Sequence, residues 1–377
     1  MSLASAFAGA RRLTGVRGTV AGPGGSHSDK VVLLPQRDSR WDTEDLVLRA
    51  CSAADLAARA IVGSPPDAKR DAALLLRSLT PVREVDLRLR RAHEVLLDAL
   101  RPCVGGPDLT STLCRHPGTA LEESRSYVLL RDLGHRDAAV DAVLDSILSE
   151  PNPLGGDRLP TAQLEQHWLR GIWARSSHPS PDEEEVLART CLAHPLDAFD
   201  QTRQQTAALT HAILYASDLG RRPVEWPRTP LEIARDAQTC LVTALDEGDL
   251  GVAAEVLWAW PMLRLRWSPV ASFAFGLLAD SQAMGVLCAT VLATGSRPVQ
   301  TRPRARPTVQ HAAHAALERL LDLREAEPGW LPAYFSLDPA DRAALAPLLL
   351  TSLLRRARRA GDVGRVQELL CLALELG

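Results

Sequence analysis

The chain has 377 residues, of which 46% are hydrophobic and 24% are charged, which is the composition of a globular protein. Its formal net charge of −3 creates no global field that would attract nucleic acid or an anionic membrane, so we expect neither as a partner. No apolar stretch reaches the ~18 residues that a spanning helix needs, and the N-terminus lacks a signal-peptide pattern, so the expected location is cytoplasmic.

The cysteines are odd in number and irregularly spaced, with no Cys-x-x-Cys pair. We therefore expect free thiols in a reducing cytosol, and neither a disulfide framework nor a zinc ribbon. No cofactor-binding motif is present either: there is no Walker loop, no dinucleotide-binding glycine motif, no nucleophile elbow and no HExxH. No cofactor is predicted. The cysteines are Cys51, Cys103, Cys114, Cys191, Cys240, Cys288 and Cys371.

Residues 1–40 are rich in Gly, Ser and Arg and lack a helical period, so they are predicted to form a flexible N-terminal tail. Residues 41–377 are predicted to form a single all-helical domain. Amphipathic segments follow one another there, separated by Pro, Gly and Asp, and no run of alternating β-branched residues competes with them. The predicted helices are 42–62, 67–78, 80–101, 119–133, 136–149, 159–174, 182–194, 198–217, 230–246, 250–264, 269–293, 308–325, 338–359 and 362–376.

The helix predicted over 159–174 carries Glu165 and Trp168 on one face. Glu165 lies in an otherwise apolar helix, so it is a candidate base or the partner of a buried arginine. Further along, Asp200 and Arg203 lie two to three turns before His211 and could reach the same cavity. We take these four residues as candidate substrate-binding positions.

The most informative segment runs from Thr210 to Gly220. His211, Tyr215 and Asp218 are spaced i, i+4 and i+7, which places them on one helical face, and Gly220 is expected to end the helix. An imidazole, a phenol and a carboxylate in one stripe suit acid–base catalysis, so these three are the candidate catalytic residues. The alternative is a hydrogen-bonded network between packed helices. His211 and Asp218 could also supply two metal ligands, but nothing completes a set, and no metal site is predicted.

One internal similarity links two distant parts of the chain. Gly248-Asp-Leu-Gly251, followed by Glu255, reappears as Gly361-Asp-Val-Gly364, followed by Glu368, and a weaker copy begins at Gly134. Each copy has the form of the turn and outgoing helix of a helical hairpin. Such repetition predicts hairpins arranged as an α/α toroid or a helical solenoid, with chance matching as the alternative.

Two arginine-rich stretches lie near the C-terminus. Residues 295–307 combine arginines with prolines and are predicted to form an exposed loop, either a solvated linker or a lip for an acidic partner. The run from Arg355 to Arg359 is predicted to be a solvated helix end, where cations are favourable, rather than a nucleic-acid patch.

The pattern from Thr210 to Gly220, with the upstream Arg158-Leu-Pro and Glu165 to Trp168 segment, resembles an uncharacterised all-helical actinobacterial family. Such proteins resemble components of biosynthetic gene clusters, including those for ribosomally made and modified peptides. The resemblance implies a role for His211, Tyr215 and Asp218 but assigns no reaction. The α/α-toroid cyclases of lanthipeptide biosynthesis share the expected architecture, but this chain lacks their zinc-ligand motifs.

Two functional hypotheses remain. In the first, the protein is a metal-free cyclase of a peptide substrate, in which His211 acts as general base or acid, Tyr215 protonates the enolate or holds its oxygen, and Asp218 orients the imidazole. In the second, it is a non-catalytic helical scaffold that binds a partner biosynthetic protein or a leader peptide, and an exposed apolar surface near Trp258, Trp260 and Trp267 would support this hypothesis.

Overall fold

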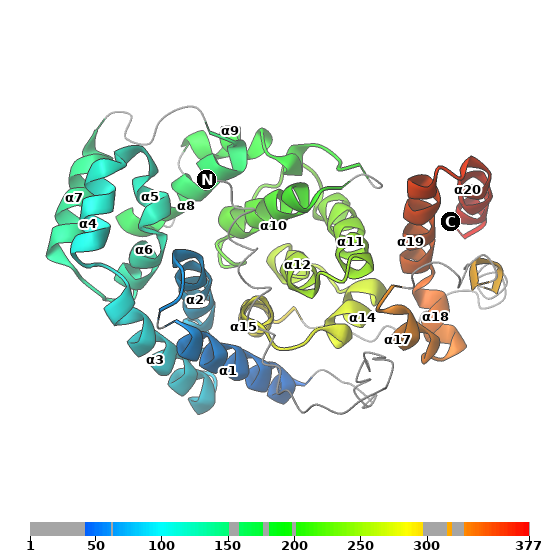
Figure 1. Ribbon diagram of the computed structural model, residues 1–377, viewed down its shortest axis with the longest axis horizontal. Helices are drawn as coiled ribbons and strands as arrows, with labels where there is room; N and C mark the ends of the chain where they lie inside the picture. The colour runs from blue at the N-terminus through cyan, green and yellow to red at the C-terminus, as the bar shows by residue number, and fades with distance from the viewer. Residues whose placement is uncertain are drawn as a thin grey trace, which may run out of the picture. The chain divides into compact units, whose positions relative to one another are not determined.

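The computed structural model describes residues 42–61, 63–150, 158–175, 181–197, 201–296, 315–318 and 328–376 (Figure 1). Within these ranges the chain forms helices joined by turns, and no strand occurs, so the all-α prediction is confirmed. The helices are α1 (Thr43–Ala60), α2 (Pro66–Leu79), α3 (Leu87–Leu100), α4 (Gly106–Arg115), α5 (Ala120–Glu123), α6 (Arg125–Asp132), α7 (Ala138–Ser149), α8 (Pro160–Ala174), α9 (Pro181–Ala188), α10 (Arg203–Ser217), α11 (Pro230–Asp246), α12 (Leu250–Val256), α13 (Ala259–Met262), α14 (Pro269–Leu277), α15 (Gln282–Thr294), α17 (Leu331–Phe335), α18 (Pro339–Ala344), α19 (Ala346–Ala360) and α20 (Val363–Leu376).

Cap residues explain where the helices start. Thr229 and Glu232 form a reciprocal capping box at the start of α11, and Pro230 occupies its first turn, where a missing N–H costs nothing. The helix predicted over 80–101 begins only at Leu87, because the Asp86 side chain caps α3. The predicted helix over 269–293 is divided into α14 and α15, because Ser281 caps a new start.

Helix α4 was not predicted from the sequence. It begins at Gly106 with Pro107 in its first turn, after Gly105 with a φ of +108°. A proline in the first turn of a helix is well tolerated, because its missing N–H would have no partner there. The predicted tail 1–40, most of the loop 295–307 and most of the predicted helix 308–325 lie outside the described residues.

The chain makes contacts between helices that are far apart in the sequence. Helix α1 packs against α3 and also against α15 (Figure 1). Gly285 allows the close approach to α15, because a Cβ at this position would lie 2.5 Å from the Cβ of Ala53 in α1. An open solenoid has contacts only between neighbouring repeats, and the α1–α15 contact is not of that kind. A closed toroid of hairpins stays a prediction.

The repeated Gly-Asp motif has the predicted local structure in both strong copies. Gly248 and Gly361 adopt positive φ values of +67° and +71°, which glycine reaches without strain. Asp249 then caps α12, and the Asp362 carboxylate accepts a hydrogen bond from the Arg365 N–H at the start of α20. The motif therefore joins α11 to α12 and α19 to α20 as packed helical pairs.

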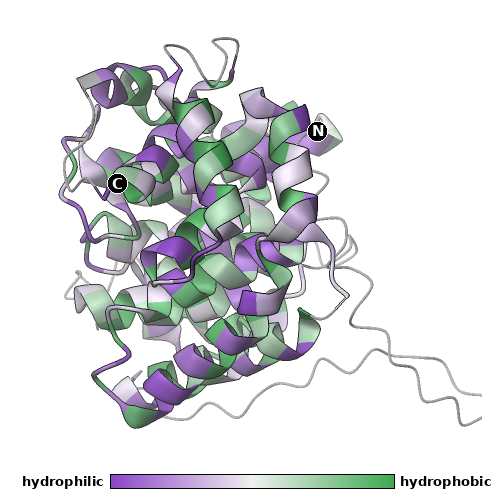
Figure 2. Ribbon diagram, turned by 90° about the vertical axis from the view of Figure 1, so that its left-hand side faces the viewer, coloured by the Kyte–Doolittle hydropathy of each residue, from purple (hydrophilic) through white to green (hydrophobic). Residues whose placement is uncertain are grey.

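Most helices carry both hydrophobic and hydrophilic residues, as is expected of amphipathic helices that pack against a core (Figure 2). The tryptophans that the scaffold hypothesis expected at the surface are buried: Trp258 is 4% exposed, and Trp260 and Trp267 are each 2% exposed. Their apolar area contributes to the core, and the Trp258 indole donates to the Ala283 carbonyl. The expectation of an exposed Trp-rich surface is therefore wrong.

Candidate functional site

Helix α10 carries two of the three predicted catalytic residues. It starts at a capping box formed by Thr202 and Gln205, and nearly all of its second half is buried. It packs against α8, α12 and α13, so His211 and Tyr215 lie in the interior rather than at the surface. The rings of His211 and Tyr215 are 5.8 Å apart, which confirms that they share one face of the helix.

Asp218 lies outside this helix. Helix α10 ends at Ser217, and Asp218 is its C-cap in the left-handed conformation, with a φ of 46°. The predicted C-cap, Gly220, follows two residues later with a φ of +78°. Asp218 is therefore turned away from the helical register on which the stripe was predicted. The i+7 argument fails at this residue, because the helix ends before reaching it.

The Asp218 carboxylate is a structural ion-pair partner. It accepts hydrogen bonds from Arg77 Nε and Nη2 at 2.9–3.1 Å and from the Trp168 indole at 2.8 Å. Arg77 also donates to Asp132 at 2.9 Å. Burial alone would raise the pKa of Asp218, but Arg77 and the other donors lower it overall. Asp218 thus joins α2, α8 and α10, which is a positional role and not the predicted orientation of the imidazole.

His211 is buried, and one of its ring nitrogens makes no hydrogen bond. Its side chain is 8% exposed, and Nδ1 has no hydrogen-bond partner. Burial, together with the smaller effect of the nearby Arg125 charge, lowers the pKa of His211 to about 4. The imidazole is therefore neutral at neutral pH, with a ring nitrogen that no protein group occupies.

Tyr215 lies between an aromatic ring and a cation. Its ring is 5.1 Å from that of Trp168, and its hydroxyl oxygen accepts a hydrogen bond from Arg125 at 3.3 Å. No described residue accepts the proton of the Tyr215 hydroxyl. Burial raises the pKa of Tyr215, while Arg125 opposes that effect. The phenol consequently keeps a proton that it can donate, beside a cation that stabilises negative charge on its oxygen.

Glu165 and Trp168 both lie on α8 and contact the side chains around Tyr215. Glu165 is 2% exposed and forms an ion pair with Arg125 of α6. Of the two roles predicted for Glu165, the structure contains the partnership with a buried arginine. Trp168 contacts the Tyr215 ring and donates to Asp218, so it connects the acid–base pair to the Arg77 ion pair.

The two remaining predicted residues do not join this group. Arg203, at the start of α10, is 42% exposed at its side chain and forms an ion pair with Asp249 at 3.3 Å. It therefore reaches the start of α12 and not His211. Asp200 lies outside the described residues.

Sequence reasoning missed Arg125, Asp71 and Glu255. Burial raises the pKa of Glu255 to about 8 and that of Asp71 to about 6. The Asp71 charge adds to the effect of burial on both Glu255 and Tyr215, so these side chains belong to one electrostatic neighbourhood. A lone acid in the apolar segment Val252–Leu257 was an available signal for Glu255, whereas Asp71 and Arg125 stand among other charges in the sequence.

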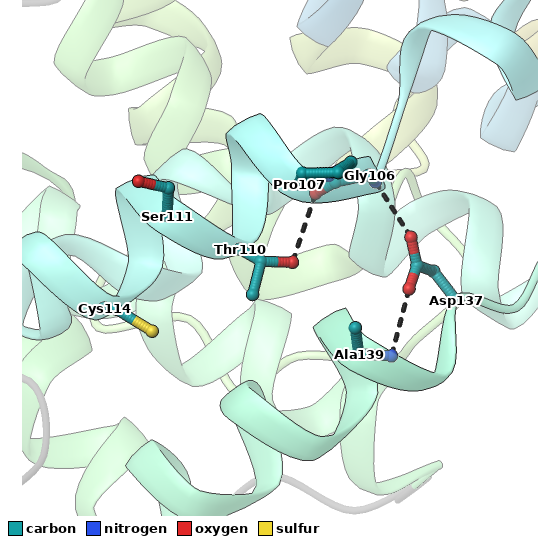
Figure 3. Close-up of a pocket in the computed structure, with 7 residues that line it drawn as sticks. All are labelled: Gly106, Pro107, Thr110, Ser111, Cys114, Asp137 and Ala139. Carbon is teal, nitrogen blue, oxygen red and sulfur yellow. Dashed lines mark hydrogen bonds between the residues drawn. The ribbon is translucent and has the colours of Figure 1, made fainter.

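A surface pocket lies elsewhere, between α4 and the start of α7 (Figure 3). Asp137 lines it, but its carboxylate already accepts hydrogen bonds from the Gly106 N–H at 2.8 Å and the Ala139 N–H at 3.0 Å. Thr110 likewise donates to the Gly106 carbonyl. None of the predicted site residues lines this pocket, and its polar groups stabilise helix ends.

Among the described residues, no group of three or more His, Cys, Asp or Glu side chains is arranged to hold a metal ion. None of the described helices is both long and apolar enough to cross a bilayer.

The fold and the site define an all-helical protein with a buried group of titratable side chains. Residues 49–317 match the profile of a family described as a domain of unknown function, DUF6895, and the chain belongs to this family. The match includes α10 and the side chains grouped around His211 and Tyr215. Neither the curated proteins nor the solved structures contain a match to the chain.

Proposed function

We propose that the protein is a helical enzyme that transfers protons through His211 and Tyr215 during the tailoring of a ribosomally made peptide. One observation carries the proposal. The two side chains are buried on one face of α10, and each retains an unused position, Nδ1 of His211 and the hydroxyl proton of Tyr215. Buried polar groups are normally satisfied by the protein, so the unsatisfied Nδ1 of His211 beside the Tyr215 phenol supports this proposal.

The reaction that suits this pair is closure of a thioether ring without zinc. His211 accepts the proton of a cysteine thiol, and the sulfur forms a bond to the β-carbon of a dehydroamino acid. The electron pair of the carbon–carbon double bond moves to the carbonyl oxygen as an enolate. Tyr215 then protonates the α-carbon, and the proton held by His211 returns to the Tyr215 oxygen. Arg125, which donates to Tyr215, stabilises the negative charge while the phenol is deprotonated.

We propose a peptide substrate because the Thr210–Gly220 segment resembles a family of biosynthetic proteins. We propose acid–base chemistry because of the His211 and Tyr215 side chains. The non-catalytic scaffold is the alternative. It loses the support that exposed tryptophans would have provided, since Trp258, Trp260 and Trp267 are buried.

The test uses a synthetic peptide that contains one dehydroalanine and one cysteine. After incubation, free thiols are alkylated, and the unalkylated fraction measured by mass spectrometry gives the extent of ring closure. Wild-type protein should accelerate closure over buffer. His211→Gln and Tyr215→Phe should remain folded and lose at least 100-fold in rate, as expected for loss of an acid–base group.

Thermal unfolding of the same samples separates chemistry from folding. Folded variants that close the ring as fast as the wild type would refute the acid–base roles. Peptide binding by the wild type without any acceleration of closure would favour the scaffold.

A further inference from the structure

Arg355 is buried where α19 packs against α11. The sequence analysis expected the arginines at 355–359 to form a solvated helix end. Arg358 and Arg359 meet this expectation, with side chains that are 51% and 61% exposed. Arg355 does not, because the residue is 2% exposed. It forms an ion pair with Glu247, the C-cap of α11, and α11 lies beside α19 in Figure 1.

The guanidinium group of Arg355 has no hydrogen-bond partner at any of its three nitrogens. The paired carboxylate is Glu247, whose oxygen is 3.7 Å from Nη2, beyond hydrogen-bond distance. Glu247 is itself 44% exposed and accepts a hydrogen bond from Arg359 at 3.0 Å. Nearby Asp246 already accepts hydrogen bonds on Oδ1 from Trp330 and Ser352. The protein therefore buries a cation without supplying acceptors for its donors.

Such an arrangement is costly in the absence of a ligand. A buried cation that lacks hydrogen-bond partners is strongly destabilising, and native proteins rarely contain one. Arginine presents its donors in a planar fork that matches the oxygens of carboxylate and phosphate groups. An oxyanion would therefore provide acceptors for the N–H groups of Arg355 that have no hydrogen-bond partner.

A second unsatisfied donor lies against the same face of α11. Gln201 is 7% exposed, and its Nε2 has no hydrogen-bond partner, while its Oε1 accepts a hydrogen bond from Thr243. Thr243 and Glu247 are four residues apart in sequence and therefore neighbours on one helical face. Gln201 contacts Thr243 in the last turn of α11, and Arg355 forms its ion pair with Glu247, the C-cap of the same helix.

We propose that Arg355 and Gln201 form a binding site for an oxyanion, a carboxylate or phosphate group, between α11 and α19. Arg355 binds the anion through its guanidinium fork, and Gln201 donates its amide N–H to another oxygen. The partly exposed Arg359 at the rim favours entry of an anion. The site is separate from His211 in residues and in chemistry, and it does not depend on the proposed function.

The experiment measures thermal unfolding of the full chain at pH 7 in sodium phosphate, sodium acetate and sodium chloride at equal ionic strength. An anion at about tenfold its dissociation constant should raise Tm by about 2–4 °C over chloride. The phosphate arm and the acetate arm distinguish the two anion classes. In Arg355→Met, the added stabilisation over chloride should disappear, because the guanidinium group that binds the anion has been removed.

Arg358→Met is the matched control, since it removes the same charge from the same helix at an exposed position. It should keep the anion-dependent rise in Tm. Gln201→Leu provides a second variant, which should weaken the anion effect without removing the cation. The proposal is overturned if neither phosphate nor acetate raises the Tm of the wild type above chloride, or if Arg355→Met and Gln201→Leu both retain the full rise.

Discussion

Replacing the buried Glu255 with glutamine should make the stability of the protein less sensitive to a rise in pH from about 5 to 8. Glu255 is 6% exposed, and burial raises its pKa from the ordinary 4.5 to about 8, with the charge of Asp71 adding to the effect. Arg203 acts in the opposite direction but does not cancel it. The folded chain therefore keeps this proton at pH values where the unfolded chain has released it.

The sign and size of the effect follow from the difference between the two states. Because the folded-state pKa is raised, the stabilising contribution is fully present below pH 4.5 and is lost as pH rises through about 8. At ~1.4 kcal/mol per pH unit, the loss across this window approaches ~5 kcal/mol. Glutamine has nearly the same shape and no proton to release, so its free energy of unfolding lacks this pH dependence.

The assay is urea unfolding at pH 5, 6.5 and 8 for the wild type and Glu255→Gln. We expect the free-energy difference between the two proteins to grow in favour of the variant as pH rises. Glu94→Gln, at an exposed position on α3, is the control for removing one carboxylate. If the curves of the wild type and Glu255→Gln stay parallel from pH 5 to 8, the reasoning about burial of Glu255 is wrong.

Three further predictions test the surroundings of the site. Asp218→Ala should lower the free energy of unfolding by about 3–5 kcal/mol in urea titrations, because it leaves the buried Arg77 without its bidentate partner; a loss below about 1 kcal/mol would contradict the ion-pair role. Gly285→Val should lower Tm by several degrees through a clash with Ala53, and Ala53→Gly should partly restore it. The pKa of His211 is lowered to about 4, so the contribution of its neutral form to the free energy of unfolding should be fully present above the ordinary pKa of 6.5. This contribution should fall by roughly 3 kcal/mol as the pH drops towards 4. His211→Gln should abolish the loss in acid titrations.

Local features of the fold were predictable because they depend on neighbouring residues. The start of α11 follows from Thr229, Pro230 and Glu232, which determine a capping box within one turn. The turn after α11 follows in the same way from Gly248 and Asp249. The α1–α15 contact could not be predicted, because it depends on a missing side chain at Gly285 opposite a residue far away in sequence.

The candidate site was predictable in part for the same reason. His211 and Tyr215 share a helical face whatever lies opposite, so spacing was sufficient to pair them. The placement of Asp218 on the helical face could not be checked by spacing, because spacing does not reveal that the helix ends at Ser217 and that Arg77, in α2, binds the carboxylate. The burial of Arg355 depends on the surface of α11 and could not be read from a run of arginines.

The most direct measurement of the acid–base account is the pH dependence of ring closure on the dehydroalanine–cysteine peptide. In buffer, the rate follows the thiolate fraction and should rise about 100-fold from pH 6 to pH 8, since a free thiol has a pKa near 8.5. If His211 accepts the thiol proton, kcat/KM is controlled by an imidazole that is already neutral at pH 6. We predict a change in kcat/KM of less than about threefold across this range. A rise as steep as that in buffer would contradict a proton-accepting role for His211.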